Sequence, residues 1–344
     1  MIKNDFYQYE KSMKDRPHVV LLGAGATMAS IPNGDKNGKK SSVMNNFIKT
    51  LGMTSLLEQV NLQTNSDNLE DIYTELHERS DCKEIREKLD SKIREYFLEL
   101  EIPDEPNIYD FILLSLRKKD LVATFNWDPL LLQAYQRVYR ITRDLPDLAF
   151  LHGNVLVGYC SDHKFGGMID DCCRECGKPF QPSRLLYPIR HKNYAEDPFT
   201  QNNWDRVRRA FKKAYLVTVF GYSAPKMDAE AIALLKEYWG EIEDRNFEDF
   251  EFIDIRLEDE LINSWSDFVH THHYSVVDNF FKSSLAHFPR RTTIELFDRT
   301  MNCRFTESKS GKQFRQNMDW QDVEKVVNNL LTEEWDNDGG ILTV

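Results

Sequence analysis

The stretch that decides the fold is Val19-Val20-Leu21-Leu22-Gly23-Ala24-Gly25-Ala26-Thr27. Four aliphatic residues in a row predict a strand that is buried on both faces, as in a parallel sheet covered by helices. The glycines that follow predict a tight turn into a helix, and the backbone N–H groups of such a turn can hold an anion. The sequence therefore predicts an α/β fold with a ligand site beside residues 23–27.

Further strands are predicted downstream, and several end in small or polar residues. The runs are residues 121–125, 148–151, 214–220 and 250–255. Their alternation with helical segments predicts a Rossmann-like, doubly wound parallel sheet. Asn126, Asp128 and His152 follow two of these strands, and the carboxyl ends of parallel strands share one edge of the sheet. We therefore expect the three side chains to belong to one site.

The chain divides into four parts on pattern and composition. Residues 1–157 are predicted to form the first part of the Rossmann-like domain, with a helical insert at about 43–118. Residues 158–192 form a small cysteine-containing module, and residues 193–260 the second part of the domain. Residues 261–344 are predicted to be peripheral helices. The turn-rich segment 33–42 is predicted to be a mobile surface loop that could act as a lid.

Length and charge limit the kind of protein this is. The 344 residues fit about two domains, or one large domain with an insert. A formal charge of −12 argues against nucleic acid or an anionic membrane as a direct ligand. No apolar run approaches the roughly 20 residues of a membrane helix, and the charged N-terminus does not have the pattern of a signal peptide. We expect a cytoplasmic protein.

Four of the six cysteines lie within one short stretch, residues 160–176. Cys160-x2-His163 and Cys173-x2-Cys176 form two pairs of soft ligands, which is the pattern of a structural zinc site with tetrahedral coordination. Cys172 could replace Cys173, because the spacing does not decide between them. A site closed by four protein ligands leaves no open position, so the metal is expected to stabilise the module.

Two other nucleotide-binding patterns fit the chain poorly. The dinucleotide fingerprint of dehydrogenases needs a third glycine where Met28 stands, and an acid about 20 residues later that is missing. Residues 38–41 resemble a P-loop only superficially, because Lys40 occupies the place of the Ser or Thr. Hydride transfer and ATP hydrolysis are therefore disfavoured.

Taken together, the motifs resemble the sirtuin (silent information regulator) superfamily. Four features occur in that family's order over residues 18–256: Gly23-Ala24-Gly25-Ala26-Thr27 with Ile31-Pro32, Thr124-x-Asn126-x-Asp128, His152-Gly153 before the cysteine module, and Gly221-x-Ser223. Pro225 and Asp228 look more like the divergent bacterial sirtuin-like group than the protein deacylases.

The resemblance implies a pocket for nicotinamide adenine dinucleotide (NAD+), used as a substrate, between the Rossmann-like sheet and a structural Zn2+ module. Carried over by position, residues 23–27 would hold the pyrophosphate, and Asn126 and Asp128 would lie near the nicotinamide ribose. Gly221 and Ser223 would meet the adenosine half, with Asp254 accepting hydrogen bonds from ribose hydroxyls. His152 matches the family's catalytic base.

Departures from the family pattern favour NAD+ hydrolysis of the kind found in bacterial antiphage defence. Ile31-Pro32 continues as Asn33-Gly34-Asp35, without the arginine of the deacylases. The zinc module also has His163 in place of a cysteine, and a helical insert separates the first two strands. The alternatives are an NAD-dependent protein deacylase or ADP-ribosyltransferase, and a non-catalytic sensor of NAD+ or ADP-ribose. The resemblance further implies a regulatory protein partner or a homo-oligomer.

Overall fold

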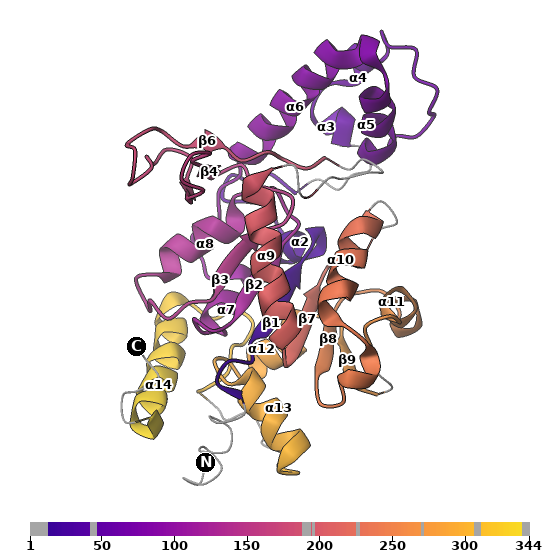
Figure 1. Ribbon diagram of the computed structural model, residues 1–344. Helices are drawn as coiled ribbons and strands as arrows, with labels where there is room; N and C mark the ends of the chain where they lie inside the picture. Colours follow the sequence, from indigo (N-terminus) through magenta and orange to yellow (C-terminus); the bar gives the residue numbers. More distant parts are fainter. Residues whose placement is uncertain are drawn as a thin grey trace.

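A six-stranded parallel sheet forms the centre of the computed structural model (Figure 1). The structure describes residues 13–41, 47–187, 194, 197–224, 228–269, 272–305 and 311–338. Pro225, named in the family resemblance, lies outside these residues. The sheet has the order β3-β2-β1-β7-β8-β9. Its strands are β1 (His18–Leu22), β2 (Leu121–Thr124), β3 (Asp147–Phe150), β7 (Leu216–Phe220), β8 (Asp249–Ile253) and β9 (Tyr274–Val277).

Helices cover both faces of the sheet, which confirms the predicted doubly wound α/β fold. Val19 and Leu21 of β1 pack with α9 (Pro198–Lys213), α10 (Ala229–Trp239) and α11 (Glu258–Trp265). Val20 and Leu22 face the opposite layer, which contains α2 (Ala24–Ser30), α7 (Ile108–Leu114), α8 (Leu130–Val138), α12 (Ser284–His287) and α14 (Trp320–Asp338). Burial on both faces explains why β1 is an unbroken apolar run.

The strand order reverses between β1 and β7. From β1 the chain adds β2 and then β3 on one side, and it later returns to add β7, β8 and β9 on the other. Such a switch point leaves a crevice at the carboxyl ends of the two adjacent strands. Gly23 follows β1 and Gly221 follows β7, so the two glycine turns that the sequence singled out meet at this crevice.

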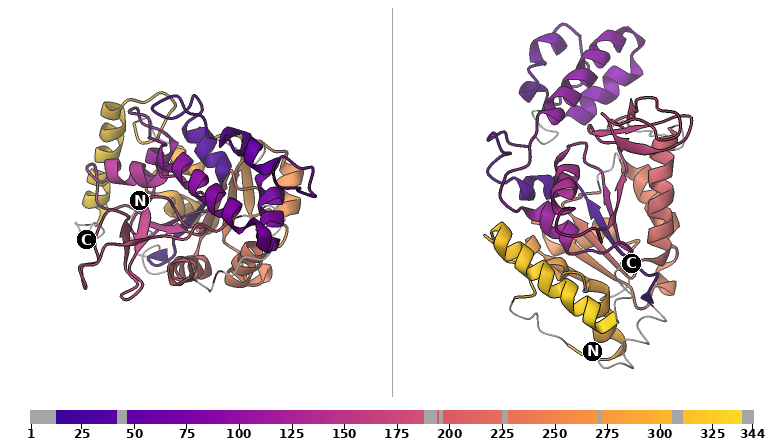
Figure 2. Two further views of the ribbon diagram at one scale, coloured as in Figure 1. Left: turned by 90° about the horizontal axis from the view of Figure 1, so that it is seen from above. Right: turned by 90° about the vertical axis from the view of Figure 1, so that its left-hand side faces the viewer.

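The predicted helical insert is present and divides into two groups. Helices α3 (Phe47–Thr50), α4 (Thr54–Leu57), α5 (Leu69–Glu78) and α6 (Lys83–Leu98) form a lobe at one end of the molecule, as Figure 2 shows. Helix α7 contacts α2 and α8 beside the sheet. Its Asn107 side chain caps the N–H groups of Tyr109 and Asp110. The last part of the insert therefore belongs to the core of the site.

The C-terminal region contributes a strand as well as helices. Strand β9 pairs with β8 in parallel register, Phe250 with Tyr274 through Ile253 with Val277. The predicted C-terminal helices are present, and β9 is a strand among them that the sequence does not indicate. β9 lies at the edge of the sheet and is only partly buried, so it has neither the apolar run of β1 nor a clear alternation. In the same region, helix α13 (Thr292–Met301) contacts β7.

The segment predicted to be a mobile loop is a folded turn where the structure describes it, to Ser41. The buried Asp35 carboxylate accepts hydrogen bonds from the N–H groups of Asn37 at 2.9 Å, Lys39 at 2.8 Å and Glu101 at 3.1 Å. These bonds close the turn on itself and tie it to the end of the helical lobe. Turn-forming composition alone does not reveal such a central carboxylate, and the expectation of a lid finds no support here.

None of the helices in the described residues combines the length and the apolar composition needed to cross a bilayer.

A buried histidine predicts how the stability of the fold depends on pH. His18 is fully buried, with Nδ1 2.9 Å from Thr292 Oγ1 and Nε2 2.8 Å from Thr218 Oγ1. Burial, followed by the charge of Lys119, lowers the pKa of His18 to about 3. Because the unfolded chain binds this proton near pH 6.5 and the folded chain does not, the stabilisation is present above pH 6.5 and is lost as the pH falls toward 3.

We expect the free-energy difference between the wild type and His18→Gln to shrink by about 1.4 kcal/mol for each pH unit below 6.5. Urea unfolding at a series of pH values measures this difference. Glu251, whose pKa burial raises, remains in both proteins, so its opposite contribution largely cancels. Parallel pH profiles for the two proteins would contradict the assignment.

Candidate functional site

The glycine turns after β1 and β7 are in direct backbone contact. The N–H of Gly25 donates to Gly221 O at 3.0 Å, and the N–H of Gly23 donates to Phe220 O at 3.0 Å. A Cβ on Gly25 would lie 2.7 Å from Gly221 Cα, and one on Gly221 would lie 2.5 Å from Gly25 Cα. Gly221 also has φ +58°, which favours glycine. The sequence therefore needs glycine at these positions to close the turn.

Thr27 is the centre of a hydrogen-bond network at the carboxyl end of β1 and β2. Its Oγ1 donates to Asp128 Oδ2 at 2.7 Å, and so it accepts from Asn126 Nδ2 at 3.0 Å and from Tyr109 OH at 2.7 Å. Asn126 Nδ2 also donates to Gly23 O at 2.8 Å. The structure thus brings together the glycine turn and two residues expected after β2. Tyr109 was not predicted.

The Asp128 carboxylate bonds both to the Thr27 hydroxyl and to the backbone at the start of α8. It is buried, and its Oδ1 accepts from the N–H of Leu130, the first residue of α8, at 3.1 Å. Burial raises the pKa of Asp128, while the Thr27 hydroxyl and the Leu130 N–H act to lower it. Burial also raises the pKa of Tyr109, so that its hydroxyl remains a donor. The arrangement holds Asn126 in one orientation.

His152 follows β3 and lies in a second polar cluster. It is 6% exposed; its Nε2 is 3.2 Å from Tyr194 OH and 3.9 Å from Asp228 Oδ1. Tyr222 donates to Asp228 Oδ2 at 3.0 Å, and burial raises the pKa of both tyrosines. Tyr194 and Tyr222 were not predicted, because residues far apart in the sequence carry no local signal of their meeting.

Phe125 links the two clusters. Its ring stacks on Tyr222 at a centroid distance of 4.1 Å and meets His152 edge-on at 5.0 Å. Since Phe125 immediately precedes Asn126, the histidine cluster and the Thr27 network share one wall. The candidate catalytic residues therefore occupy neighbouring positions along the carboxyl ends of β2 and β3.

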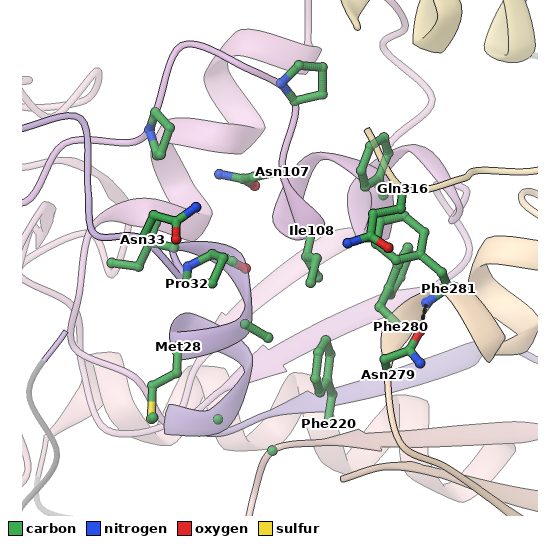
Figure 3. Close-up of a pocket in the computed structure, with 18 of the residues that line it drawn as sticks. Met28, Pro32, Asn33, Asn107, Ile108, Phe220, Asn279, Phe280, Phe281 and Gln316 are labelled. Atoms are coloured by element: carbon green, nitrogen blue, oxygen red, sulfur yellow. Dashed lines mark hydrogen bonds between the residues drawn. The ribbon is translucent and has the colours of Figure 1, made fainter. Parts of the chain in front are cut away.

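A cavity of about 1740 Å³ opens beside the switch point (Figure 3). Its lining includes four of the predicted nucleotide-binding residues: Gly25, Gly221, Ser223 and Asp254. Gly23, Ala24, Ala26, Thr27, Asn126, Asp128 and His152 are not part of this lining. Sequence reasoning thus located one wall of the cavity and a neighbouring polar network, but it did not identify the other walls.

Those other walls come from three regions that are distant in sequence. Asn107 and Ile108 begin α7, Asn279, Phe280 and Phe281 follow β9, and residues 316–320 lead into α14 (Figure 3). The cavity is larger than the roughly 300–1,000 Å³ of a typical small-molecule pocket, which leaves room for a dinucleotide.

Two buried polar atoms in the lining have no hydrogen-bond partner among the described residues: Ser30 Oγ and Asn107 Nδ2. Ser30 is 4% exposed and Asn107 is 8% exposed. The orientation of the Asn107 amide is fixed, because its Oδ1 accepts from the N–H of Tyr109 at 2.9 Å. Leaving these buried polar atoms unpaired costs folding free energy.

The cysteine module contains the predicted four-ligand group. The ligand atoms of Cys160, His163, Cys173 and Cys176 all lie within 4.8 Å of one another. Cys160 Sγ is 3.7 Å from Cys176 Sγ and 3.6 Å from His163 Nδ1, and Cys173 Sγ is 3.6 Å from His163 Nδ1. Tetrahedral zinc with the usual bond lengths requires edges of about 3.8 Å for S–S and about 3.6 Å for S–N. The residues therefore fit Zn2+, and Cys173 rather than Cys172 belongs to the group.

The backbone of the module supports this geometry. Its sheet consists of β4 (Val157–Tyr159), β5 (Gly166–Met168) and β6 (Gln181–Pro182), in the order β5-β4-β6. The backbone N–H of Lys164 donates to Cys160 O, and the backbone N–H of Gly177 donates to Cys173 O, each at 2.8 Å. The same hydrogen bond therefore closes the turn after each of the two cysteines. Hydrogen bonds from the backbone N–H and the side chain of His163 lower the pKa of Cys160 to about 6, which favours the thiolate that zinc binds.

The module is tied to the site through Asn154. Asn154 is fully buried and donates from Nδ2 to Asp128 O at 2.6 Å, while Ser183 Oγ donates to Asn154 O at 2.7 Å. Ser183 directly follows β6. A bound zinc would stabilise the module and so hold Asn154 against the Asp128 turn.

We expect the purified protein to contain about one equivalent of zinc, as a four-ligand structural site requires. Cys173→Ser should lose the metal, whereas Cys172→Ser should retain it, because Cys172 is exposed and outside the group. Metal analysis measures the content, and limited proteolysis within residues 157–182 measures the loosening of the module. A metal-free wild type with a protease-resistant module would contradict the assignment.

No family model and no curated protein matches this sequence. The chain is similar to solved structures, among them a mutant Sir2 homologue in complex with ADP-ribose, at 13% identity over 87% of this chain and 99% of that chain, with a TM-score of 0.41. A Sir2 homologue in complex with NAD has 14% identity over 84% of this chain and 93% of that chain, with a TM-score of 0.36.

A third, Sir2Tm bound to a propionylated peptide, has 14% identity over 80% of this chain and 92% of that chain, with a TM-score of 0.36. All three are Sir2 (sirtuin) structures, the superfamily that the motifs of this chain resemble.

Proposed function

We propose that this chain is a sirtuin-like hydrolase that cleaves the nicotinamide–ribose bond of NAD+ and releases nicotinamide and ADP-ribose. The observation that carries the proposal is the meeting of Asn126, Asp128 and Tyr109 on Thr27, next to the glycine contact at the switch point. Preorganised polar groups of this kind can stabilise a developing positive charge without rearranging during the reaction.

The reaction needs a leaving base, a nucleophile and a proton acceptor. The electron pair of the C–N bond leaves with N1 of nicotinamide, which becomes neutral, and the ribose carbon becomes oxocarbenium-like. A water oxygen then bonds to that carbon and loses a proton. In this proposal His152 accepts the proton, and Asn126 orients the ribose or the water. Tyr194 and Asp228 hold the His152 ring, because Tyr194 OH lies 3.2 Å and Asp228 Oδ1 lies 3.9 Å from His152 Nε2.

The cavity supports the placement of the adenosine half. Gly25, Gly221, Ser223 and Asp254 share its lining, and the crevice outside the carboxyl ends of the strands is where open α/β sheets bind nucleotides. Two backbone N–H groups of the turn, those of Gly25 and Ala26, already donate to Gly221 O and Gly23 O. The pyrophosphate is therefore expected to contact the turn through fewer backbone groups than the motif alone implies.

Hydrolysis is preferred over deacylation because of the residues after Ile31-Pro32. Where the resemblance expects an arginine, the chain folds around the buried Asp35 carboxylate, with Gly34 packed against Gly38. The proposal includes a role in antiphage defence, with the activity gated by a partner protein or by self-assembly, because unregulated hydrolysis would deplete NAD+ in the host.

Incubation with NAD+ in the presence and absence of an acetyl-lysine peptide tests the proposal. Nicotinamide release that does not depend on the peptide is the expected result. Release only when the peptide is present would favour deacylation instead. Calorimetry with ADP-ribose serves as the binding control: binding without any turnover by the protein alone would favour a sensor over an ungated hydrolase.

A further inference from the structure

Asp254 and Arg256 form an ion pair on the wall of the cavity, at the end of β8. Asp254 Oδ1 accepts from the N–H of Arg256 at 2.9 Å and from its Nε at 3.1 Å, and Asp254 Oδ2 accepts from its Nη2 at 2.8 Å. The Asp254 side chain is 11% exposed and the Arg256 side chain 27%. The arginine was not predicted as a site residue.

The pair leaves limited hydrogen-bonding capacity on each side. A carboxylate has about four lone-pair positions, and Arg256 occupies three of them, two on Oδ1 and one on Oδ2. The remaining position on Oδ2 can accept one hydroxyl donor. The charge of the guanidinium is meanwhile neutralised by the carboxylate that holds it, so the pair presents an acceptor rather than a cation.

The rest of the lining is acidic. Among the described residues, six carboxylates line the cavity against two cations, Lys36 and Arg256, and Lys36 Nζ is itself 2.8 Å from Asp104 Oδ1. The acids are Asp35, Asp104, Glu105, Asp254, Asp278 and Asp319. A phosphate group carries about 1.5 to 2 negative charges at neutral pH. A phosphate placed against Asp254 would therefore meet net negative charge.

We infer that the Asp254–Arg256 pair selects a dinucleotide with a free ribose diol and rejects the 2′-phosphorylated form. The inference rests on the proposed function, since it assumes that the adenosine half lies beside Gly221 and Ser223. In dinucleotide-binding folds, an acid beside the ribose accepts a hydrogen bond from the 2′-hydroxyl, whereas an unengaged arginine there accommodates a 2′-phosphate. Asp254 performs the first role and prevents Arg256 from performing the second.

Calorimetric binding of ADP-ribose and of 2′-phospho-ADP-ribose tests the inference without requiring turnover. We expect the wild type to bind ADP-ribose at least tenfold more tightly than the 2′-phosphorylated compound. Asp254→Asn keeps the shape of the side chain, removes its charge and frees Arg256. It should narrow the preference at least fivefold, mainly through tighter binding of the 2′-phosphorylated compound.

The double variant Asp254→Asn/Arg256→Gln separates the two charges. It should lose the affinity for the 2′-phosphorylated compound that Asp254→Asn gained, because no released guanidinium remains. Equal affinity of the wild type for both compounds, or an unchanged preference in Asp254→Asn with an unchanged melting temperature, would overturn the inference. Failure of all the proteins to bind ADP-ribose would contradict the proposed function and the inference together, whereas selective binding without turnover would support the inference and count only against an ungated hydrolase.

Discussion

Replacing Gly221 by alanine is expected to lower the free energy of unfolding by about 2–5 kcal/mol and to weaken the binding of ADP-ribose. The added Cβ would lie 2.5 Å from Gly25 C and Cα and from Ala26 N, which are backbone atoms and cannot rotate away. The residue would also keep φ +58°, which L side chains rarely adopt. Removing these clashes requires the turns after β1 and β7 to move apart, and this movement displaces Gly25 from the cavity wall.

Gly52→Ala is the matched control for this substitution. Gly52 lies just after α3 with φ +67°, but a Cβ there would meet no heavy atom within 4 Å. It should cost only about 1 kcal/mol, the conformational part of the effect. Urea unfolding of both variants gives the comparison. Equal losses of stability would mean that the contact between the two glycine turns does not hold the switch point together.

His152→Ala is expected to lower kcat for nicotinamide release at least about hundredfold, the usual size of a general-base contribution. The affinity for ADP-ribose should change little, because His152 does not line the cavity that contains Gly221 and Asp254. Steady-state kinetics and calorimetry on the same preparation separate these two effects.

The exposed His77, on helix α5, gives a control for the loss of an imidazole elsewhere. His77→Ala should retain the wild-type rate. Wild-type turnover by His152→Ala would remove His152 from the mechanism. A parallel loss of ADP-ribose binding and of melting temperature would instead assign His152 a structural role in its cluster with Tyr194 and Asp228.

The central strands and the metal-binding group could be predicted because their signals are local. Four consecutive aliphatic residues in β1 require burial on both faces, and ligands spaced as two close pairs require a common metal. The choice between Cys172 and Cys173 could not be made from spacing. In the structure Cys172 pairs with Pro179 in an isolated bridge, which turns its side chain to the surface, while Cys173 is buried.

The parts that were not predicted depend on contacts between distant residues. Tyr109 reaches Thr27 across 82 positions of sequence, and Tyr194 reaches His152 across 42. β9 was missed because an edge strand that is half exposed has a weak hydrophobic pattern. Arg256 was missed because its role follows from the orientation of its guanidinium toward Asp254. The sequence indicates which residues can do chemistry, but tertiary packing decides which of them share a cavity.

The measurement that tests the central claim most directly is the mass balance of the reaction with NAD+ alone. Chromatography of the products against time should give one free ADP-ribose for each nicotinamide released, and mass spectrometry should find no ADP-ribose attached to the protein. Nicotinamide accompanied by protein-linked ADP-ribose in place of free ADP-ribose would contradict hydrolysis. NAD+ recovered intact would contradict hydrolysis by the protein alone.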